Sequence, residues 1–560
     1  MKRIIIYLVA MAFAYQMQAQ NSEYDFWDGD FCYKILSEVD KTVELVQNQT
    51  PCWYGYVGKI TIPDSVEYSG KYYQVISFGS YVFYGSDISI KFPKGLLNIA
   101  DHCFYGAKLQ SIVVLPDSLK TIGECAFFGQ AGVTKIVIPA SVKYISPRAF
   151  SIETLDSVIV DSANVYYKSV DGVLYSKVEP KILYFPKARR GSFDLPNWVT
   201  CIGRGAFLGT YLSSIILPNT LKTIERGAFV QCRYISNLNI PSSVNCIHGG
   251  AILACDVLSN LSVDSLNPRY KVIENMLYTI DGDTLVSAPL PTRVPDASDI
   301  LKIPQDTKVI GKRALHLGSN ATIIELPEGL KEIKPFAFYE NDVRQIQFPN
   351  SLKIIDSNAF NSCEYLSSFT GGDSLERIEY GAFAYCNNFR KRVVFPQGLK
   401  YLGAYAFYRT GVKTIELTGE VDSLIYPFEI IGELTLVNQQ PPYISTADEG
   451  VEVFRIGKII IPCGATSAYM SDPNWSSYNY EEDCGGVEEI DPQSTVQVVA
   501  QHHAIEVHNA ENYTVAIYDV MGRCYVSESA TGQSLRHYPL PTAGVYVVHI
   551  NGKGYKVVVR

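Results

Sequence analysis

The stretch LPDSLKTIGECAFFG (residues 115–129) has no pattern typical of catalysis, yet its skeleton recurs along most of the chain. The skeleton is an apolar residue, a proline, three residues, a lysine, and then I-x-x-x-A-F. In this unit the proline is Pro116, and the phenylalanine that ends the phrase is Phe127, eleven positions later. A sequence motif that recurs without catalytic residues indicates a structural repeat.

The spacing from the proline, here called the anchor, to the phenylalanine position is the same in every regular unit. The anchors are Pro93, Pro116, Pro139, Pro196, Pro218, Pro241, Pro304, Pro327, Pro349, Gly372 and Pro396. The interval between successive anchors is nearly constant where the array is regular, and it is more than doubled after Pro139 and after Pro241. An earlier unit, Pro63 to Phe83, fits with a nine-residue insertion. The repeat predicts a solenoid of stacked coils.

Each unit has the pattern of one coil. Alternating apolar residues before the anchor, such as Val113 and Leu115, predict a short strand. The anchor proline ends the strand because it lacks a backbone donor. An isoleucine six residues after the anchor, such as Ile122, and the A-F pair are expected to point inward. One coil cannot bury this set alone, so neighbouring coils share one core.

Composition and motifs exclude several functions. The chain has 560 residues, a net charge of −9 and 19% charged residues. A negative chain with a pI near 5.5 is not expected to bind nucleic acid. It has no H-E-x-x-H, G-x-S-x-G or phosphate-loop motif, and GRGAFLG (203–209) is the repeat phrase itself. We therefore expect no enzyme, no cofactor and no metal site.

The first residues, MKRIIIYLVAMAFAYQMQAQ, have the pattern of a secretory signal peptide over residues 1–19. A basic start and an apolar run precede a predicted cleavage between Ala19 and Gln20. No later stretch reaches the length of about 18 apolar residues that a spanning helix needs. We expect an exported protein at the cell surface or outside the cell, without a transmembrane segment.

The pattern I-x-[IL]-P-x-x-[LV]-K-x-I-G-x-x-A-F-x-x-C resembles the BspA-type leucine-rich repeats of exported bacterial proteins. The resemblance covers residues 59–420 and implies a leucine-rich repeat solenoid of short strands, turns and short helical or extended segments. It also implies hairpins inserted near 164–186 and 267–289 and a closing unit over 421–486. We expect residues 20–58 to form an N-terminal cap. Members of this family act as adhesins toward host matrix proteins, such as fibronectin and fibrinogen, or toward other bacteria.

Residues 487–560 leave the repeat. Alternating segments such as VAIYDVMGR (515–523) and GYKVVVR (554–560) predict a small antiparallel β-domain, sandwich-like, with turns marked by glycine. This domain resembles the C-terminal sorting domain of the type IX secretion pathway of Bacteroidota, which implies that secretion machinery is a partner. The alternative is a small terminal β-sandwich without a sorting role.

Export permits disulfides among the 13 cysteines. Two pairs are candidate disulfides, Cys32 with Cys52 in the cap and Cys463 with Cys484 around the closing unit. A second set shares one register, the last position of the A-F-x-x-C phrase, and consists of Cys232, Cys255, Cys363 and Cys386. Bridges along the stack are one interpretation of this set, and small buried thiols are the favoured one.

Lysine recurs four residues after the anchor. These residues, here called the lysine row, are Lys120, Lys143, Lys222, Lys308, Lys331, Lys353 and Lys400. One hypothesis is a discontinuous ridge for an anionic partner, such as a sulfated glycan or an acidic protein. The alternative is that turn positions favour solvated charge, which also prevents edge-to-edge aggregation.

Three functions remain open. The first is a binding protein, an adhesin that recognises a host matrix or other cell-surface protein through the extended solenoid wall. The second is a non-catalytic glycan-binding accessory that stacks sugars on exposed aromatics of the inserted hairpins. Its candidate aromatic contacts are Tyr166, Tyr167, Tyr175 and Tyr184. The third is a structural spacer without a ligand.

Overall fold

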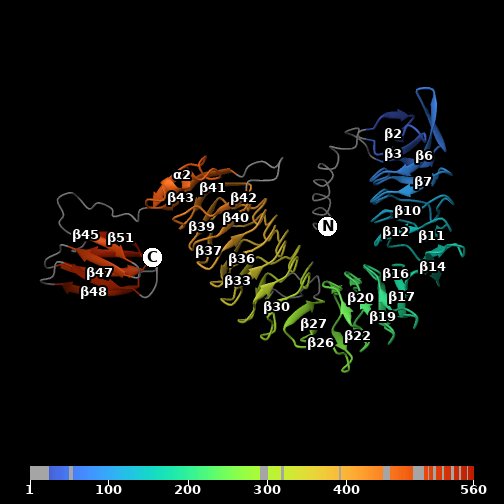
Figure 1. Ribbon diagram of the computed structural model, residues 1–560. Coiled ribbons are helices and arrows are strands. Elements are labelled where there is room, and N and C mark those ends of the chain that lie inside the picture. The colour runs from blue at the N-terminus through green and yellow to red at the C-terminus, as the bar shows by residue number, and fades with distance from the viewer. Residues whose placement is uncertain are drawn as a thin grey trace. The chain divides into compact units, whose positions relative to one another are not determined.

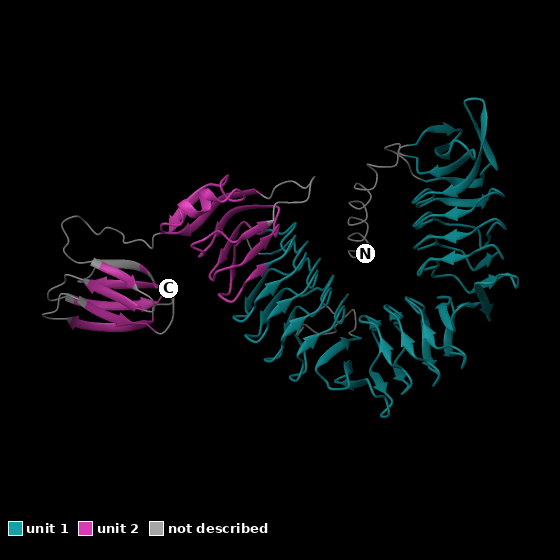
Figure 2. Ribbon diagram, viewed as in Figure 1, with its two compact units in different colours: residues 1–390, 402–411 teal, residues 391–401, 412–560 magenta. Residues whose placement is uncertain are grey.

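The computed structural model describes residues 24–48, 55–289, 300–316, 321–389, 392–445 and 455–483, and most of 497–559. In that last stretch the described segments are 497–501, 504–508, 513–519, 523–530, 535–540, 544–550 and 553–559. The predicted signal peptide, with Ala19 and Gln20, lies outside the described residues. The chain divides into two compact units, residues 1–390 with 402–411 and residues 391–401 with 412–560 (Figure 2).

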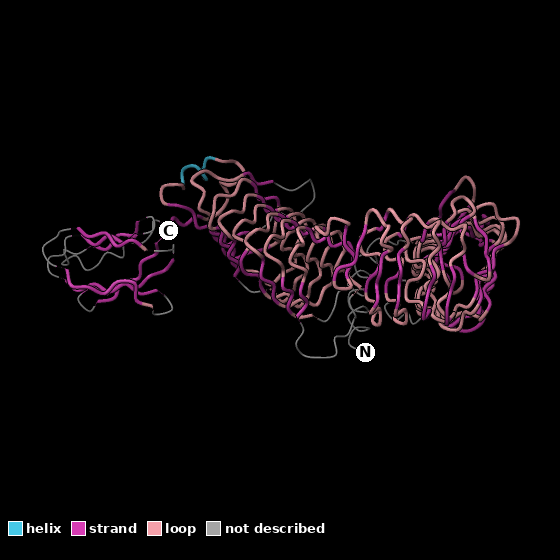
Figure 3. The backbone as a smooth tube through the Cα atoms, turned by 90° about the horizontal axis from the view of Figure 1, so that it is seen from below, coloured by secondary structure: helices cyan, strands magenta, loops and turns pink. Residues whose placement is uncertain are grey.

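The first unit is a solenoid of stacked coils (Figure 1). The strand before each anchor pairs in parallel with its counterpart one coil away, as Ile136 of one coil pairs with Val113 of the preceding coil. Figure 3 shows these strands and the loops of successive coils running side by side. These strands are β4 (Val57–Thr61), β7 (Asp87–Lys91), β9 (Ile112–Val114), β11 (Lys135–Ile138), β13 (Ser157–Val160), β17 (Arg190–Asp194), β19 (Tyr211–Ile216), β22 (Asn237–Ile240), β25 (Asn260–Val263), β29 (Ile300–Lys302), β31 (Ile323–Glu325), β33 (Gln345–Phe348) and β35 (Ser368–Gly371).

A two-residue strand follows the anchor turn and forms the second stack of parallel pairs. Its second residue is the inward isoleucine, and Ile122, Ile224 and Ile355 are fully buried. These strands are β8 (Asn98–Ile99), β10 (Thr121–Ile122), β12 (Tyr144–Ile145), β18 (Cys201–Ile202), β20 (Thr223–Ile224), β23 (Cys246–Ile247), β30 (Val309–Ile310), β32 (Glu332–Ile333), β34 (Ile354–Ile355) and β36 (Arg377–Ile378). The predicted repeat solenoid is therefore confirmed.

The phenylalanines of the A-F pairs form the centre of the core. The rings of Phe338 and Phe360 stack with centroids 4.7 Å apart and planes 5° from parallel. Phe360 stacks on Phe383 in the same way, at 5.3 Å and 3°. The same stack forms near the N-terminus, where the ring centroids of Phe104 and Phe127 lie 5.1 Å apart. Each coil with a phenylalanine thus adds one ring to the apolar core, while buried Ile252 and Leu315 occupy this position in their two coils.

Antiparallel hairpins interrupt the stack at the two long gaps. The first consists of β14 (Tyr167–Val170), β15 (Val173–Ser176) and β16 (Lys181–Tyr184), and the second of β26 (Tyr270–Ile273), β27 (Met276–Thr279) and β28 (Thr284–Ser287). Buried asparagines precede both hairpins. Asn164 donates to the carbonyls of Pro139 and Val142, and Asn267 donates in the same way to Pro241 and Val244.

The N-terminal cap continues the stack as a mixed sheet, in which β3 pairs with β6 in parallel and the other pairs of cap strands are antiparallel. Its strands are β1 (Phe26–Asp28), β2 (Phe31–Ser37), β3 (Thr42–Val46), β5 (Ser65–Tyr68) and β6 (Lys71–Phe78). Cys32 lies on β2 opposite Val46 and is a buried free thiol. The predicted bridge from Cys32 to Cys52 is therefore wrong, because the strand encloses Cys32 among its neighbours; Cys52 lies outside the described residues.

The second unit begins with parallel coils and contains one short helix among its described residues, α2 (Thr466–Ser471). Its parallel strands are β37 (Arg392–Phe395), β39 (Thr414–Leu417), β41 (Ile430–Thr435), β43 (Arg455–Pro462) and β44 (Tyr480–Asp483), with the pair β40 (Ser423–Ile425) and β42 (Tyr443–Ser445). Trp475 is fully buried and donates to the carbonyl of Pro442. Cys463 is disulfide-bonded, and its predicted partner Cys484 lies outside the described residues.

The C-terminal domain has two antiparallel sheets around its own apolar core, which contains Ile505, Ile517 and Val548. Its strands are β45 (Gln497–Gln501), β46 (Ala504–His508), β47 (Tyr513–Asp519), β48 (Cys524–Ala530), β49 (Leu535–Pro539), β50 (Gly544–Ile550) and β51 (Lys553–Val559). The small all-β domain predicted from the alternating pattern is confirmed. Among the described residues, no helix is long and apolar enough to cross a membrane.

Candidate functional site: the corner face of the repeat

Each coil turns sharply at the A-F pair, in a segment here called the corner. The residue two positions before the phenylalanine position has a left-handed backbone in these coils, with φ between +52° and +73°. These residues are Tyr81, His102, Cys125, Arg148, Gly205, Gly227, Gly250, Arg313, Phe336, Asn358, Gly381 and Tyr405. Nonglycine residues at such angles cost backbone energy, so the turn itself requires this conformation.

Hydrogen bonds between coils hold the corners in line. The backbone N–H groups of His102, Phe104 and Gly106 donate to carbonyls of the next coil, at 2.8–2.9 Å. Gly205, Phe207 and Gly209 repeat this pattern. Alternate N–H groups therefore point along the stack, and one side chain from each corner lies next to its counterpart on the following coil.

Aromatic side chains occupy the corners at the N-terminal end. The ring of Tyr81 stacks on His102 at 5.0 Å and 10°. In a parallel row, Tyr105 lies between Tyr84 and Phe128, at 5.9 Å and 4.8 Å. All five rings are partly exposed. They form a continuous aromatic strip over three successive coils.

A second aromatic group covers the corners near residues 380–409. Tyr380 and Tyr385 are 50% and 41% exposed, and each makes an edge-on contact at 5.6 Å with the next coil, through Tyr405 and Tyr408 respectively. Arg409 lies over the rings of Tyr385 and Tyr408. We call the two aromatic groups, together with the arginines between them, the corner face.

Arginines dominate the middle of the corner face. Arg148, Arg204, Arg226 and Arg313 all lie at corner positions. Arg148 pairs with Glu124 at 2.6 Å, and Arg204 approaches the same carboxylate at 3.6 Å. Tyrosine and arginine are enriched, and lysine depleted, where proteins contact one another. The corner face therefore has the composition of a protein-binding surface.

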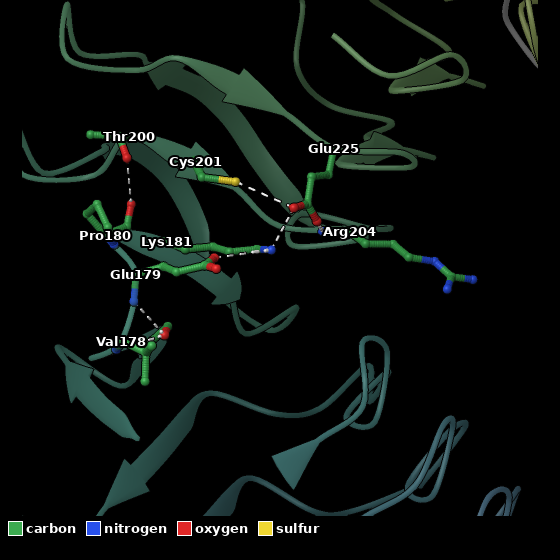
Figure 4. Close-up of polar contacts among 9 residues, drawn as sticks. Val178, Glu179, Pro180, Lys181, Thr200, Cys201, Arg204 and Glu225 are labelled. Atoms are coloured by element: carbon green, nitrogen blue, oxygen red, sulfur yellow. Dashed lines mark hydrogen bonds and ion pairs between the residues drawn. The ribbon is translucent and has the colours of Figure 1, made fainter. Parts of the chain in front are cut away.

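A polar cluster lies beside these arginines where the first hairpin enters the stack. Lys181 and Glu225 form an ion pair of 2.6 Å, and both side chains are largely buried. Burial opposes the charge on Glu225, but the bond from Lys181 prevails and lowers the pKa of that carboxyl. Figure 4 shows the backbone N–H of Arg204 directed at Glu225 while its guanidinium extends away.

The four cysteines of the A-F-x-x-C register are free and buried. Each thiol donates to the carbonyl of the phenylalanine one coil before, as Cys255 does to Phe229 at 3.0 Å. The prediction of small buried thiols is confirmed for Cys232, Cys255, Cys363 and Cys386. Asn341 occupies the same position in its coil and donates to Leu315. Gln130 at this position donates to Phe104 in the same way, whereas Ala107 occupies it without a side-chain donor, so the position favours a buried donor but does not require one.

The structure places the lysine row at one turn of each coil. The backbone N–H of Lys331 donates to the carbonyl of Lys308, and that of Lys353 donates to Lys331, so these three lie on successive coils. Acidic residues close this group at both ends, since Lys308 pairs with Asp283 and Lys353 with Glu376. Lys143, Lys222 and Lys331 are exposed, and Lys120 is partly exposed. The Nζ of Lys400 donates to the carbonyl of Glu420.

Three of the four hairpin tyrosines are buried. Tyr167, Tyr175 and Tyr184 are 9%, 1% and 7% exposed. Tyr175 packs on Trp198, and the hydroxyl of Tyr167 accepts a hydrogen bond from the backbone of Ile145. The hypothesis of exposed sugar-stacking rings is wrong for these three, because the hairpin folds onto the coil; Tyr166 remains partly exposed.

A family model settles the relationship of the solenoid. The model described as the BspA type leucine rich repeat region matches six copies, over residues 76–170, 184–278 and 300–426, which is more than half of the chain. The chain belongs to the BspA-type leucine-rich repeat family. Residues 486–559 match a second family, described only as a domain of unknown function, DUF6383. No match was found among curated proteins.

Solved structures that are similar to this chain share low sequence identity with it. The pneumococcal vaccine antigen PcpA is 16% identical, with 82% of this chain and 98% of that chain covered and a TM-score of 0.37. A leucine-rich repeat protein from Eubacterium ventriosum is 20% identical, with 65% and 94% covered and a TM-score of 0.35. A leucine-rich cell surface protein from Faecalibacterium prausnitzii is 21% identical, with 74% and 92% covered and a TM-score of 0.29.

The corner face was not predicted from the sequence. Its residues flank the A-F phrase, which the repeat pattern assigns to the core. The available signal was the excess of tyrosine and arginine directly beside the repeated pair, as in Arg148, Tyr339 and Tyr408. Their outward direction depends on a left-handed backbone, which no residue preference indicates for Arg, Phe or Tyr.

Proposed function

We propose that this BspA-type repeat protein is exported and non-catalytic, and that it binds a partner protein as an adhesin through the corner face. The observation that carries this proposal is the aromatic and arginine content of the corner face. Tyr380 and Tyr385 are large, exposed rings braced by neighbouring coils, so they lose little conformational entropy on binding. A stack of hydrogen-bonded coils provides a rigid extended surface and needs no pocket.

The proposed class of partner comes from the resemblance to the family, whose members act as adhesins. It comprises host matrix proteins and other cell-surface proteins. We further propose that the C-terminal domain serves secretion, in keeping with its resemblance to sorting domains. The glycan-binding alternative has lost its main support, since Tyr167, Tyr175 and Tyr184 are buried.

The test is binding of the full chain to immobilised fibronectin and fibrinogen at physiological salt. The variant Tyr380→Ala/Tyr385→Ala should weaken saturable binding about tenfold or more, since exposed aromatic anchors carry much of the energy of an interface. The matched control is Tyr234→Ala/Tyr365→Ala, which removes two tyrosines of similar exposure from outside the corner. Equal losses in both variants, or binding that neither variant changes, would contradict the proposal.

A further inference from the structure

Two arginines of the corner face lack a carboxylate partner. Within the described part of the chain, the guanidinium groups of Arg226 and Arg313 form no ion pair, and the Nε of Arg313 is buried without a hydrogen-bond acceptor. Arg313 lies over the ring of Phe336 at 4.2 Å, which holds its side chain in place. Both residues are partly buried. A buried donor without a partner is costly, and an anion that accepts from it removes that cost.

The two arginines flank a coil whose corner has two glycines, Gly249 and Gly250, where other coils have side chains. The N–H of Gly227, next to Arg226, donates to the carbonyl of Gly250 on the following coil. A Cβ atom added to Gly250 would lie 3.1 Å from the Cβ of Arg313, so Arg313 lies directly beside that coil. Gly249 permits this approach, because a Cβ there would lie 1.8 Å from the carbonyl oxygen of Lys312. Arg226 and Arg313 therefore lie on the two coils that flank Gly249 and Gly250, close enough for the charge of Arg313 to act on Arg226.

The nearby carboxylates are already engaged, including Glu340 near Arg313, which is hydrogen-bonded to Tyr339. Glu124 pairs with Arg148 and Arg204, and Glu225 pairs with Lys181. The guanidinium of Arg204 extends away from Glu225 (Figure 4), so Arg204 donates to this carboxylate through its backbone N–H alone. Positive charge thus exceeds negative charge on this part of the corner face, in a chain whose net charge is −9.

The pKa directions agree with this imbalance. Burial lowers the pKa of Arg226, and the neighbouring charges of Arg204, Arg313 and Arg148 lower it further. Burial also lowers the pKa of Arg313; Tyr339 and Glu340 oppose this effect, and Arg204 adds to it. The folded protein therefore holds like charges close together, and a bound anion would relieve their repulsion.

We propose that Arg226 and Arg313, with Arg204 beside them, bind a sulfate or phosphate group over the Gly249–Gly250 backbone. Planar guanidinium groups donate in pairs to such oxyanions, and a tetrahedral group offers enough oxygens for donors from several coils. This site is distinct from the aromatic anchors proposed for protein binding and from the lysine row. It binds a small anion without any partner protein.

The test is calorimetric titration of the full chain with inorganic pyrophosphate and, separately, with a sulfated disaccharide. The two arms distinguish phosphate from sulfate as the source of the oxyanion. The variant Arg226→Gln/Arg313→Gln should lower the affinity for the probe roughly tenfold or more, because two charge-assisted donors are lost. The control Lys59→Gln/Lys91→Gln removes two exposed positive charges from strands β4 and β7, away from the corner.

A second variant tests the site while keeping its arginines. Gly227→Asp adds a carboxylate beside Arg226, at a left-handed position that Asn358 shows to accept a side chain, and its Cβ meets only Val230 at 3.7 Å. It should abolish pyrophosphate binding with the melting temperature nearly unchanged. The proposal is overturned if neither probe binds the unmodified chain, if both site variants bind as tightly as it does, or if the lysine control loses as much affinity.

Discussion

The thiol of Cys363 donates a hydrogen bond to the backbone carbonyl of Phe338 on the preceding coil, with Sγ and oxygen 3.0 Å apart. The same carbonyl accepts from the N–H of Asn341 within its own coil. Cys386 and Phe360 repeat the contact one coil later, at 3.1 Å. The cysteine thus links neighbouring coils at the point where the phenylalanine rings stack.

Removal of this thiol should destabilise the solenoid moderately. We expect Cys363→Ala to lower the free energy of unfolding by about 1–2 kcal/mol, since it removes one hydrogen bond and leaves a small void while Phe338 keeps its second donor. Urea unfolding measures the loss. Cys363→Val fills the void without a donor, so full stability in that variant would show that the hydrogen bond contributes nothing.

The buried thiols should resist alkylation in the native protein. Burial and the nearby Glu225 raise the pKa of Cys201 to about 12, so its thiol stays protonated in mildly alkaline buffer although its side chain is partly exposed. Burial likewise raises the pKa of Cys103 well above its ordinary value. Cys524 is exposed and should react first. Peptide mapping after a short iodoacetamide pulse checks this order, and early labelling of Cys201 would contradict it.

The left-handed corner should reject β-branched residues even where space is free. Gly106 has φ +65°, and a Cβ there would meet no atom within 4 Å. Gly106→Val should therefore cost about 1–2 kcal/mol of stability through backbone strain alone. Gly106→Asn is the matched control and should cost less, because asparagine tolerates this conformation. Equal losses would show that the strain is not the cause.

Lowering the pH should reduce the free energy of unfolding through the protonation of His316. Burial lowers the pKa of His316 to about 4, and its Nδ1 lies 2.8 Å from the carbonyl oxygen of Tyr339, which can only accept. The unfolded chain binds a proton near pH 6.5, so the stabilisation is complete above that pH and is lost as the pH falls toward about 4. The loss is at most about 3 kcal/mol.

Urea unfolding at a series of pH values between neutrality and the lowered pKa measures this loss. His316→Gln should show a shallower fall in stability over that range, because it removes the titrating group while the carboxylates of the chain remain. A fall of the same slope in the variant and in the unmodified protein would contradict the assignment.

The lysine row should affect only salt-dependent binding. Lys143 and Lys331 are exposed and form no ion pair within the described residues. If an anionic partner binds there, Lys143→Gln/Lys331→Gln should weaken retention on long heparin chains at low salt and reduce its salt dependence. The control is Lys308→Gln, whose charge Asp283 already balances. Unchanged retention would indicate that the row is solvated charge.

The sequence by itself determined the solenoid, because one fixed spacing from anchor to phenylalanine repeats only if every coil buries the same positions. It also indicated that Cys232 and Cys363 are buried free thiols, since a cysteine that recurs at one interior position of the repeat is typical of a buried thiol. These conclusions depend on local periodicity alone.

Only the tertiary structure decided what lies outside the coils. The hairpin tyrosines were candidates for exposed contacts, but in the structure Tyr175 packs against Trp198. Cys32 was a candidate for a disulfide, but in the structure it is a buried free thiol. The corner face required a left-handed backbone at Arg313 and Phe336, which hydrogen bonds to the next coil impose against the residues' own preference. The excess of positive charge around Arg226 arises from arginines on other coils, such as Arg313, that an inserted hairpin separates from it in the sequence. No local sequence pattern predicts that these residues lie close together in space.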